Sequence, residues 1–386
     1  MQKRRVAVAG LGLALALVAA ACGSSSTKAA PTATTKAGAD TTAAGGAATT
    51  KAAATATTAA TATTVASAGT TAAATTAKGG KMALLFDLRG RGDKSFNDSA
   101  AVGLDKAKKE FGYTVTEGVR TGNDTAEVLK KSVDDKNVLI IGVGFAWGEE
   151  MDKSAAANPT VNYAIVDSTS KLANVSGLVF KANEGSFLVG AAAALKSKSG
   201  TIGFIGGVDI PLIQDFFVGF EAGAKAVNPA IKIDAKYIAP AGDFSGFSDP
   251  AKAKTIALKQ YEDGADVVYH AAGGSGDGLF GAAKEFSAKG KKVWAIGVDS
   301  DQALTQPADL APFILTSMIK HVDVAVYETM KDQAAGKFKG GVRVFAAKDG
   351  GVDYATTGGY VDDIKSKLDG YKADIASGKI TVPTKG

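Results

Sequence analysis

Three carboxylates stand where apolar, strand-like runs end, and they are the side chains best placed to bind a small molecule. Asp87, Asp167 and Asp299 each close such a run, and the glycines Gly273 and Gly274 follow a fourth. In an open parallel sheet, ligands bind at the carboxyl ends of the strands. Three acids and a glycine turn at that edge predict a site for a polar ligand that is uncharged or cationic.

Two phenylalanines are candidates for stacking on a planar group. Phe96 follows Ser95 in the stretch from Ser95 to Asp98, which reads as a capping box that opens a helix. Phe216 precedes Phe217 on a later predicted helix, where adjacent side chains point in different directions, so one faces the core and the other faces a cleft. A base held between Phe96 and Phe216 would gain about 1–3 kcal/mol per stacked ring. The alternative is that both rings serve packing alone.

Other chemical motifs are weaker. The run Gly276-Asp-Gly278-Leu-Phe-Gly281 fits the dinucleotide fingerprint, but it lies deep in the chain, and its glycines equally suit a tight turn. The run from Gly273 to Asp277 misses the last glycine of a nucleophile elbow. His270 stands inside a strand-like run, where a core role is more usual than that of a base. With no Cys/His cluster and no P-loop, we expect no catalytic residue, no cofactor and no metal ion.

The elements that would position these residues alternate along the chain. Strand-like runs span 82–88, 138–145, 162–167, 201–208, 231–238, 266–272 and 293–299. Helical spacing is found over 97–111, 125–136, 184–196, 212–227, 251–263 and 278–289. This alternation predicts an α/β protein with parallel sheets covered by helices on both faces. The 307 residues of 80–386 exceed what one core usually supports, so we expect two doubly wound lobes with a cleft between them.

The first 22 residues have the pattern of a secretory signal peptide. Three basic residues precede an uncharged run over 6–21, which at 16 residues is shorter than the roughly 20 that span a bilayer. The run ends in Ala19-Ala20-Ala21-Cys22, and Cys22 is the only cysteine. That ending resembles a bacterial lipoprotein signal, in which the cysteine is lipidated. The alternative is a plain secreted protein cleaved after an Ala-x-Ala site.

Residues 23–79 are expected to form a disordered tether. They contain 22 Ala and 18 Thr among 57 positions, with one Val and no Leu, Ile or aromatic residue, so they cannot bury a core. The net charge of +5 also belongs to these appendages, because the leader and the tether carry +3 each and residues 80–386 carry −1. We therefore expect no nucleic-acid partner.

A series of motifs, in order, resembles the basic membrane protein family of substrate-binding lipoproteins of ABC transporters, which includes purine-nucleoside receptors. The motifs are Asp87, Asp93-Lys-Ser-Phe-Asn97, Ile141-Gly-Val-Gly-Phe145, Ile210-Pro211 with Phe216, Gly219-Phe220 and Gly223, Gly264-Ala-Asp-Val-Val-Tyr-His-Ala-Ala-Gly273 and Ile296-Gly-Val-Asp-Ser-Asp-Gln302. The resemblance covers about residues 81–386. It implies a type I periplasmic-binding-protein fold, in which two lobes are joined by three crossover strands.

The resemblance also implies roles for single residues. Phe96 and Phe216 would stack on the base. The base edge would be addressed by Asp87, Asn97 and Asp167, and the ribose hydroxyls by Lys254, Gly273 and Asp299. Arg89-Gly-Arg91-Gly replaces a smaller, glycine-rich loop of the family and brings two cations near the expected mouth of the site.

Together these features predict an extracytoplasmic, lipid-anchored receptor that captures a purine nucleoside by hinge closure and docks on an ABC permease. We expect lobe 1 over 80–182 with 301–336 returning to it, and lobe 2 over 183–300 with 337–386 returning to it. The alternatives are a receptor of the same fold for a sugar or a signalling molecule, an extracellular nucleoside-processing enzyme, and an adhesion or regulatory lipoprotein.

Overall fold

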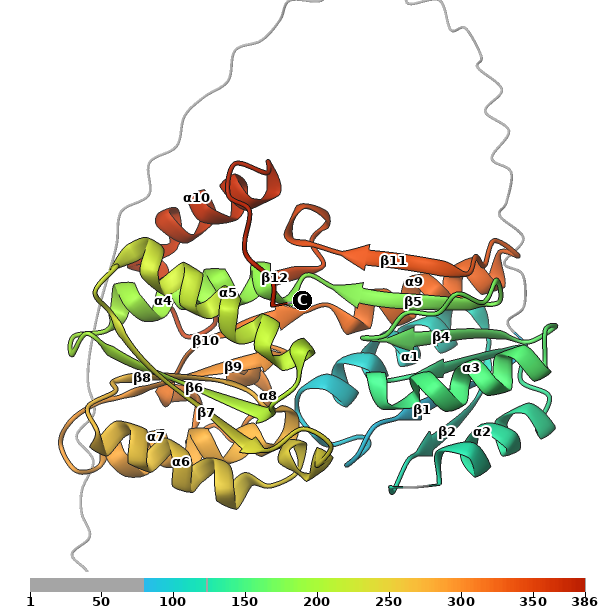
Figure 1. Cartoon of the computed structure of the whole chain (residues 1–386), viewed down its shortest axis with the longest axis horizontal. Helices are drawn as coiled ribbons and strands as arrows, with labels where there is room; N and C mark the ends of the chain where they lie inside the picture. The colour runs from blue at the N-terminus through green and yellow to red at the C-terminus, as the bar shows by residue number, and fades with distance from the viewer. Residues whose placement is uncertain (1–79, 123, 386) are drawn as a thin grey trace, which may run out of the picture. The chain divides into compact units, whose positions relative to one another are not determined.

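The computed structural model describes residues 80–122 and 124–385, which contain two six-stranded sheets (Figure 1). The leader, Cys22 and the tether lie outside these residues. The described residues fall within one compact unit. Over the same ranges, no helix has both the length and the apolar character needed to cross a bilayer.

The first lobe is built on a fully parallel sheet in the order β11-β5-β4-β3-β1-β2. Its elements are β1 (Lys81–Phe86), α1 (Phe96–Phe111), β2 (Thr114–Val119), α2 (Thr125–Asp134), β3 (Leu139–Gly142), η1 (Phe145–Trp147), α3 (Gly148–Ala157), β4 (Asn162–Val166), β5 (Val175–Phe180), α9 (Val322–Ala334) and β11 (Gly341–Phe345). Strand β3 is buried at every position, as expected for a strand covered on both faces. Helices α1 and α9 pack together, and so do α2 and α3.

The second lobe has the sheet order β12-β10-β9-β8-β6-β7, in which only the β10–β12 pair is antiparallel. Its elements are α4 (Ala182–Lys196), β6 (Thr201–Val208), α5 (Pro211–Val227), β7 (Lys232–Ala239), η2 (Phe244–Phe247), α6 (Pro250–Glu262), β8 (Val267–Ala271), η3 (Gly273–Gly276), α7 (Asp277–Ser287), β9 (Trp294–Asp299), α8 (Gln302–Thr305), η4 (Ala311–Phe313), β10 (Ile314–Lys320), η5 (Ala347–Asp349), β12 (Val352–Tyr354), η6 (Asp362–Ile364) and α10 (Lys365–Ala376). In Figure 1, α4 and α5 cover one face of this sheet and α6 and α7 the other. The expected architecture of two doubly wound lobes is confirmed.

The chain crosses between the lobes three times, and the later two crossings differ from the expected ones. The first, at Lys181, lies within two residues of the expected boundary. The second follows β10 at His321 rather than residue 301, because β10 pairs with β9 in the second sheet. The third follows β11 near Ala346 rather than residue 337, because β11 pairs with β5 in the first sheet. The first and third crossings touch, since the Lys181 N–H donates to the Phe345 carbonyl at 2.9 Å.

Helices α4 and α5 approach closely because glycines face the partner backbone. A Cβ atom at Gly190 would lie 2.1 Å from the Phe220 carbonyl oxygen, and one at Gly223 would lie 1.9 Å from the Phe187 carbonyl oxygen. Both distances are far below any real Cβ contact, so a larger residue requires the helices to separate. This packing supports the helix that carries Phe216.

Replacement Gly223→Ala should lower the free energy of unfolding by about 2 kcal/mol, because the added methyl overpacks the α4–α5 contact. Denaturation in urea would measure it. The matched control is Gly370→Ala on α10, where nothing lies within 4 Å of the added methyl. That control should be neutral or stabilising by about 0.5–1 kcal/mol through helix propensity. Equal stability of the two variants would contradict the close-packing argument.

Candidate functional site

The carboxyl ends of strands from both sheets line one cavity between the lobes. Its lining comes from both lobes and combines apolar and aromatic side chains with a few charged ones, as is usual for small-molecule sites. Seven of the eight proposed binding residues line it. They are Asp87, Phe96, Asn97, Asp167, Phe216, Gly273 and Asp299.

Lys254 is the proposed residue that the structure does not bring to the cavity. It lies on α6, and its partly exposed Nζ is 2.7 Å from the Glu285 carboxylate of α7. The main chain explains this placement, because the Asp249 carboxylate accepts from the Lys252 N–H at 2.9 Å and begins α6 there. The helix then turns the Lys254 side chain towards α7. The role in the site that the resemblance implied for Lys254 is therefore withdrawn.

The cation in the cavity is Lys320, which the sequence analysis missed. It ends β10, its side chain is 3% exposed, and its Nζ forms an ion pair with the Asp167 carboxylate of the first lobe. The ammonium also lies 4.7 Å from the ring centroid of Phe96 and 5.7 Å from that of Phe216, within the range of a cation–π interaction. A lysine at the end of an apolar run was a usable signal, but 314–320 was not among the expected strands.

Asp167 and Asp299 hold strained backbone conformations at the ends of β4 and β9. Their φ angles are 62° and 65°, in the left-handed region that residues other than glycine adopt rarely. Such strain costs on the order of 1–3 kcal/mol and tends to cluster at functional sites. The Asp299 Oδ2 accepts a hydrogen bond from the Ser95 Oγ of the other lobe at 2.7 Å. Burial raises the pKa of Asp299 to about 6.

Asp93 and Asn97 shape the loop that carries Asp87. The Asp93 carboxylate accepts from the backbone N–H groups of Ser95, Asn97 and Asp98, at 3.0, 2.8 and 3.0 Å. The Asp93 side chain thus caps α1, and the expected capping box is wrong, because the Ser95 hydroxyl accepts no hydrogen bond from the helix and instead donates across the cleft to Asp299. The Asn97 amide is also largely occupied, since its oxygen accepts from the Asp87 N–H at 3.0 Å and its nitrogen donates to the Leu88 carbonyl and Asp93.

Phe216 faces the cleft and Phe217 packs in the core, as expected. Phe216 lines the cavity, whereas the Phe217 ring packs on Phe204 with centroids 5.3 Å apart. Phe96 lines the cavity from the first lobe. Two further rings also line it, Phe145 and Phe247, which the sequence analysis had not singled out.

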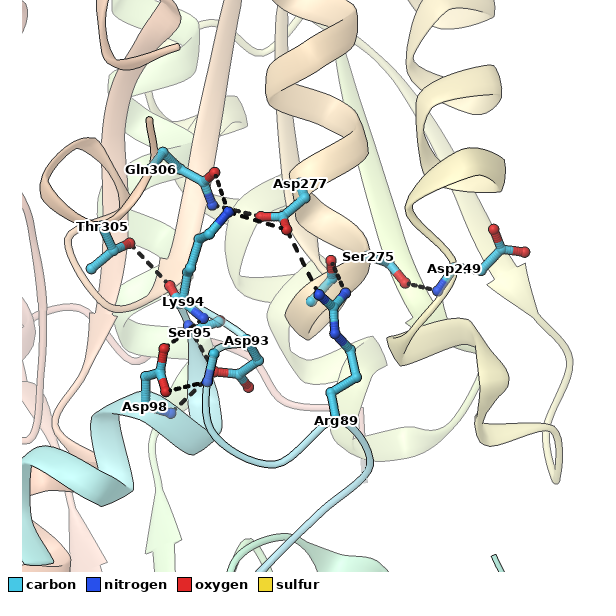
Figure 2. A network of polar contacts seen from close by, with 12 residues as sticks. Arg89, Asp93, Lys94, Ser95, Asp98, Asp249, Ser275, Asp277, Thr305 and Gln306 are labelled. Carbon is cyan, nitrogen blue, oxygen red and sulfur yellow. Dashed lines mark hydrogen bonds and ion pairs between the residues drawn. The ribbon is translucent and has the colours of Figure 1, made fainter. Parts of the chain in front are cut away.

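The two cations of the Arg89–Arg91 loop have different partners. Arg89 reaches the second lobe, where its Nη1 donates to the Gly274 carbonyl at 2.8 Å and its Nη2 lies 3.8 Å from the Asp277 carboxylate. Lys94 approaches the same carboxylate at 3.5 Å, as Figure 2 shows. Arg91 instead pairs with Asp105 and Glu117 of its own lobe. We call Arg89, Lys94 and Asp277 the ionic clasp.

Further hydrogen bonds next to the ionic clasp join Lys94 to α8 and Gln306 to α7 of the second lobe. The Gln306 amide donates to the Asp277 carboxylate at 2.6 Å. The Lys94 carbonyl accepts from the Gln302 amide at 3.2 Å. It also accepts from the Thr305 hydroxyl at 3.1 Å, as Figure 2 shows. Cations from the Arg89 loop are therefore engaged by protein groups and add no free positive charge to the cavity.

The first two glycines of the dinucleotide fingerprint, Gly276 and Gly278, serve packing, whereas nothing lies within 4 Å of a Cβ atom added at Gly281. A Cβ atom at Gly276 would lie 1.9 Å from the His270 ring, and one at Gly278 would lie 1.9 Å from the Pro250 carbonyl oxygen. His270 itself is fully buried, its Nε2 lies 2.9 Å from the Gln302 Oε1, and burial lowers its pKa to about 4. This is the core role that the sequence suggested. In the described residues, no three or more His, Cys, Asp or Glu side chains form a group that could hold a metal ion.

Replacement Asp299→Asn should change how stability depends on pH. Because the folded-state pKa of about 6 lies above the ordinary aspartate value of 3.8, protonation of Asp299 stabilises the fold fully below pH 3.8, and this stability is lost as the pH rises through 6. An asparagine does not titrate, so the variant should be more stable than wild type at pH 7.5 by on the order of 2 kcal/mol, with the difference vanishing near pH 4. Thermal unfolding across pH would measure the difference.

The matched control is Asp363→Asn on the surface. Its carboxylate is 68% exposed, and the hydrogen bond from Lys196 lowers its pKa. This variant should show no gain at pH 7.5. A pH-independent effect of Asp299→Asn would contradict the assignment.

The chain is similar to known proteins over most of its length. A family model described as ABC transporter substrate-binding protein PnrA-like matches residues 81–385. The ABC transporter nucleoside-binding protein BmpA of Lactococcus lactis subsp. cremoris is 38% identical over 321 residues, which cover 79% of this chain and 89% of that protein. Basic membrane protein A of Borreliella burgdorferi is 33% identical over 299 residues, covering 76% of this chain and 84% of that one. Among solved structures, an ABC transporter solute-binding protein from Aeropyrum pernix aligns with a TM-score of 0.69 at 30% identity, covering 78% of this chain and 93% of that one.

Proposed function

The chain belongs to the PnrA-like family of ABC transporter substrate-binding proteins, and we propose that it captures a purine nucleoside in the cavity between its lobes and delivers it to an importer. The resemblance found in the sequence motifs is thereby confirmed, as is the periplasmic-binding-protein fold. Its relatives are substrate-binding proteins of ABC transporters and not enzymes. The purine, the direction of transport and the membrane anchor are parts of the proposal.

The observation that carries the proposal is the pair of phenylalanines on opposite lobes. Phe96 and Phe216 both line the cavity, and each ring lies within 6 Å of the Lys320 ammonium. A planar base that enters between them would be in contact with both lobes at once. Binding would therefore favour the closed arrangement over the open one, because only the closed arrangement offers both stacking surfaces.

The charges of the cavity support a neutral ligand with several hydrogen-bond donors. Within the described residues, Lys320 is the one cation that lines the cavity, and it is already paired with Asp167. A phosphate would find no free cation there, so nucleotides should bind worse than nucleosides. Carboxylate oxygens of Asp87 and Asp299 can accept from N–H and O–H groups. In this proposal Asp299, Gly273 and Lys320 address the ribose, with Lys320 in the place first given to Lys254.

The stacking proposal is tested by calorimetric titration with inosine. Replacements Phe96→Ala and Phe216→Ala should each weaken binding by more than tenfold, because each removes one stacking surface worth about 1–3 kcal/mol. Lys254→Ala is the control and should bind as wild type does, since this side chain lies outside the cavity. Inosine 5′-monophosphate and free ribose are the comparison ligands. Tighter binding of ribose than of inosine would indicate that the ligand is a sugar and not a nucleoside.

Attachment to a membrane rests on Cys22, which lies outside the described residues. Support comes from the basic leader, the short uncharged run and the small residues directly before the cysteine. A lipid on Cys22 would hold the chain at the membrane, and the 57 residues of 23–79 between the anchor and the two lobes would allow the lobes to meet a permease.

The anchor is tested by expressing the full chain with Cys22→Ser in a bacterial host that processes lipoproteins. Wild type should incorporate labelled palmitate and sediment with membranes, because the acyl chains attach through the cysteine. The variant should carry no label and should be lost from the membrane fraction. Equal fractionation of both proteins without label would indicate a plain secreted protein instead.

A further inference from the structure

Arg120 is a buried cation behind the cavity wall that neither the motifs nor the proposed function uses. It directly follows β2, its side chain is 6% exposed, and its backbone N–H donates to the Phe86 carbonyl at 3.3 Å. A buried guanidinium is costly unless it is paired. Its partner is Asp87, whose Oδ1 accepts from the Arg120 Nε.

The hydrogen bonds that the Asp87 carboxylate accepts all fall on one of its two oxygens. The Oδ1 atom accepts from the Arg120 Nε and from the Leu88 N–H, the latter at 2.7 Å. Within residues 80–122 and 124–385, the Oδ2 atom has no hydrogen-bond donor. It lies 2.8 Å from the point that a Cβ atom of Gly144 would occupy, and both Asp87 and Gly144 line the cavity. The bare backbone of Gly144 thus leaves room beside Oδ2 for a ligand atom.

The second lobe covers the other side of the guanidinium. The Arg120 Cζ lies 5.6 Å from the centroid of Phe244 in η2, and the Phe244 ring in turn meets Phe145 of the first lobe edge to face at 5.4 Å. The Asp87–Arg120 pair is therefore shielded from water by aromatic groups of both lobes. In such a setting the pairing strongly favours a single orientation of the carboxylate.

We propose that Arg120 is a positioning residue that holds the Asp87 Oδ2 towards the ligand as a pure hydrogen-bond acceptor, and so makes the site select nucleobases that carry an N–H donor. This inference rests on the proposed nucleoside function. An ionised carboxylate accepts hydrogen bonds and donates none, so a base that offers an acceptor at this point leaves two lone pairs opposed. Bases with a protonated ring nitrogen, such as hypoxanthine, are then preferred over bases without any N–H.

The test compares inosine with purine riboside, which has the same two-ring base but no N–H donor on it. Wild type should bind inosine at least about tenfold more tightly than purine riboside. A buried hydrogen-bond acceptor left without a donor weakens binding by roughly that factor. In Arg120→Met the carboxylate loses its partner and is free to protonate or turn, so the ratio of the two dissociation constants should fall to within about threefold. Arg120→Lys keeps the charge and should keep part of the selectivity.

Two further variants keep the test decisive if Arg120→Met does not fold. Asp87→Asn should also lose selectivity, because an amide can turn to offer either a donor or an acceptor. Arg91→Met is the matched control: it removes a cation of the neighbouring loop whose partners are Asp105 and Glu117, and the ratio should stay at the wild-type value. Melting temperatures confirm that each variant is folded.

The outcomes separate the inference from the proposed function. Wild type that binds neither nucleoside would overturn both. Wild type that binds both, with an unchanged ratio in Arg120→Met or in Asp87→Asn, would overturn the inference alone. Equal weakening of both ligands in Arg120→Met would likewise assign Arg120 a merely structural role.

Discussion

Two opposite charges, Asp167 and Lys320, meet between the lobes with almost no contact with water. Their side chains are 6% and 3% exposed, and each comes from a different lobe. A lone buried charge costs several kcal/mol, so each of these groups depends on the other being in place. The carboxyl ends of β4 and β10, the left-handed turn at Asp167 and two phenylalanine rings within 6 Å of the ammonium all meet at this pair. The contact between the lobes at this point is thus an ion pair next to aromatic side chains.

The same pattern of acid, cation and ring recurs along the cavity. Asp87 pairs with Arg120 under Phe244, and Asp167 pairs with Lys320 beside Phe96 and Phe216. In each case the cation occupies part of the carboxylate, and the aromatic side chain keeps water from the pair. Protein groups therefore already fix the orientation of both carboxylates in this arrangement of the lobes. A carboxylate held in one orientation has less freedom to lose when a ligand binds to it.

Local patterns in the sequence were sufficient to predict where several strands end. They were insufficient to predict the side-chain contacts between residues that are far apart in the sequence. The strand end at Asp299 and the split between Phe216 and Phe217 can be predicted from neighbouring residues alone, because strand and helix periodicity determine where side chains point. Other residues carry little such local evidence. Arg120 carries none, and Lys320 carries only its place at the end of an apolar run, since the role of each depends on a partner more than thirty positions away. The capping box at Ser95 was misread for the same reason: its hydroxyl has a better acceptor, Asp299, in the other lobe. The short edge strand β11, exposed at most positions, gave no clear alternation to mark the last crossing.

The route of the chain also bears on the order in which the molecule can be assembled. The first lobe contains β1 near the start of the folded region, yet it also needs α9 and β11, which end at residue 345. A chain that emerges from its amino-terminal end therefore exposes an unfinished first sheet and an uncovered α1 until nearly all of it has been made. This late completion leaves apolar surface of the first lobe exposed for most of the synthesis of the chain. Three short crossings thus couple the architecture of the binding cleft to the timing of folding.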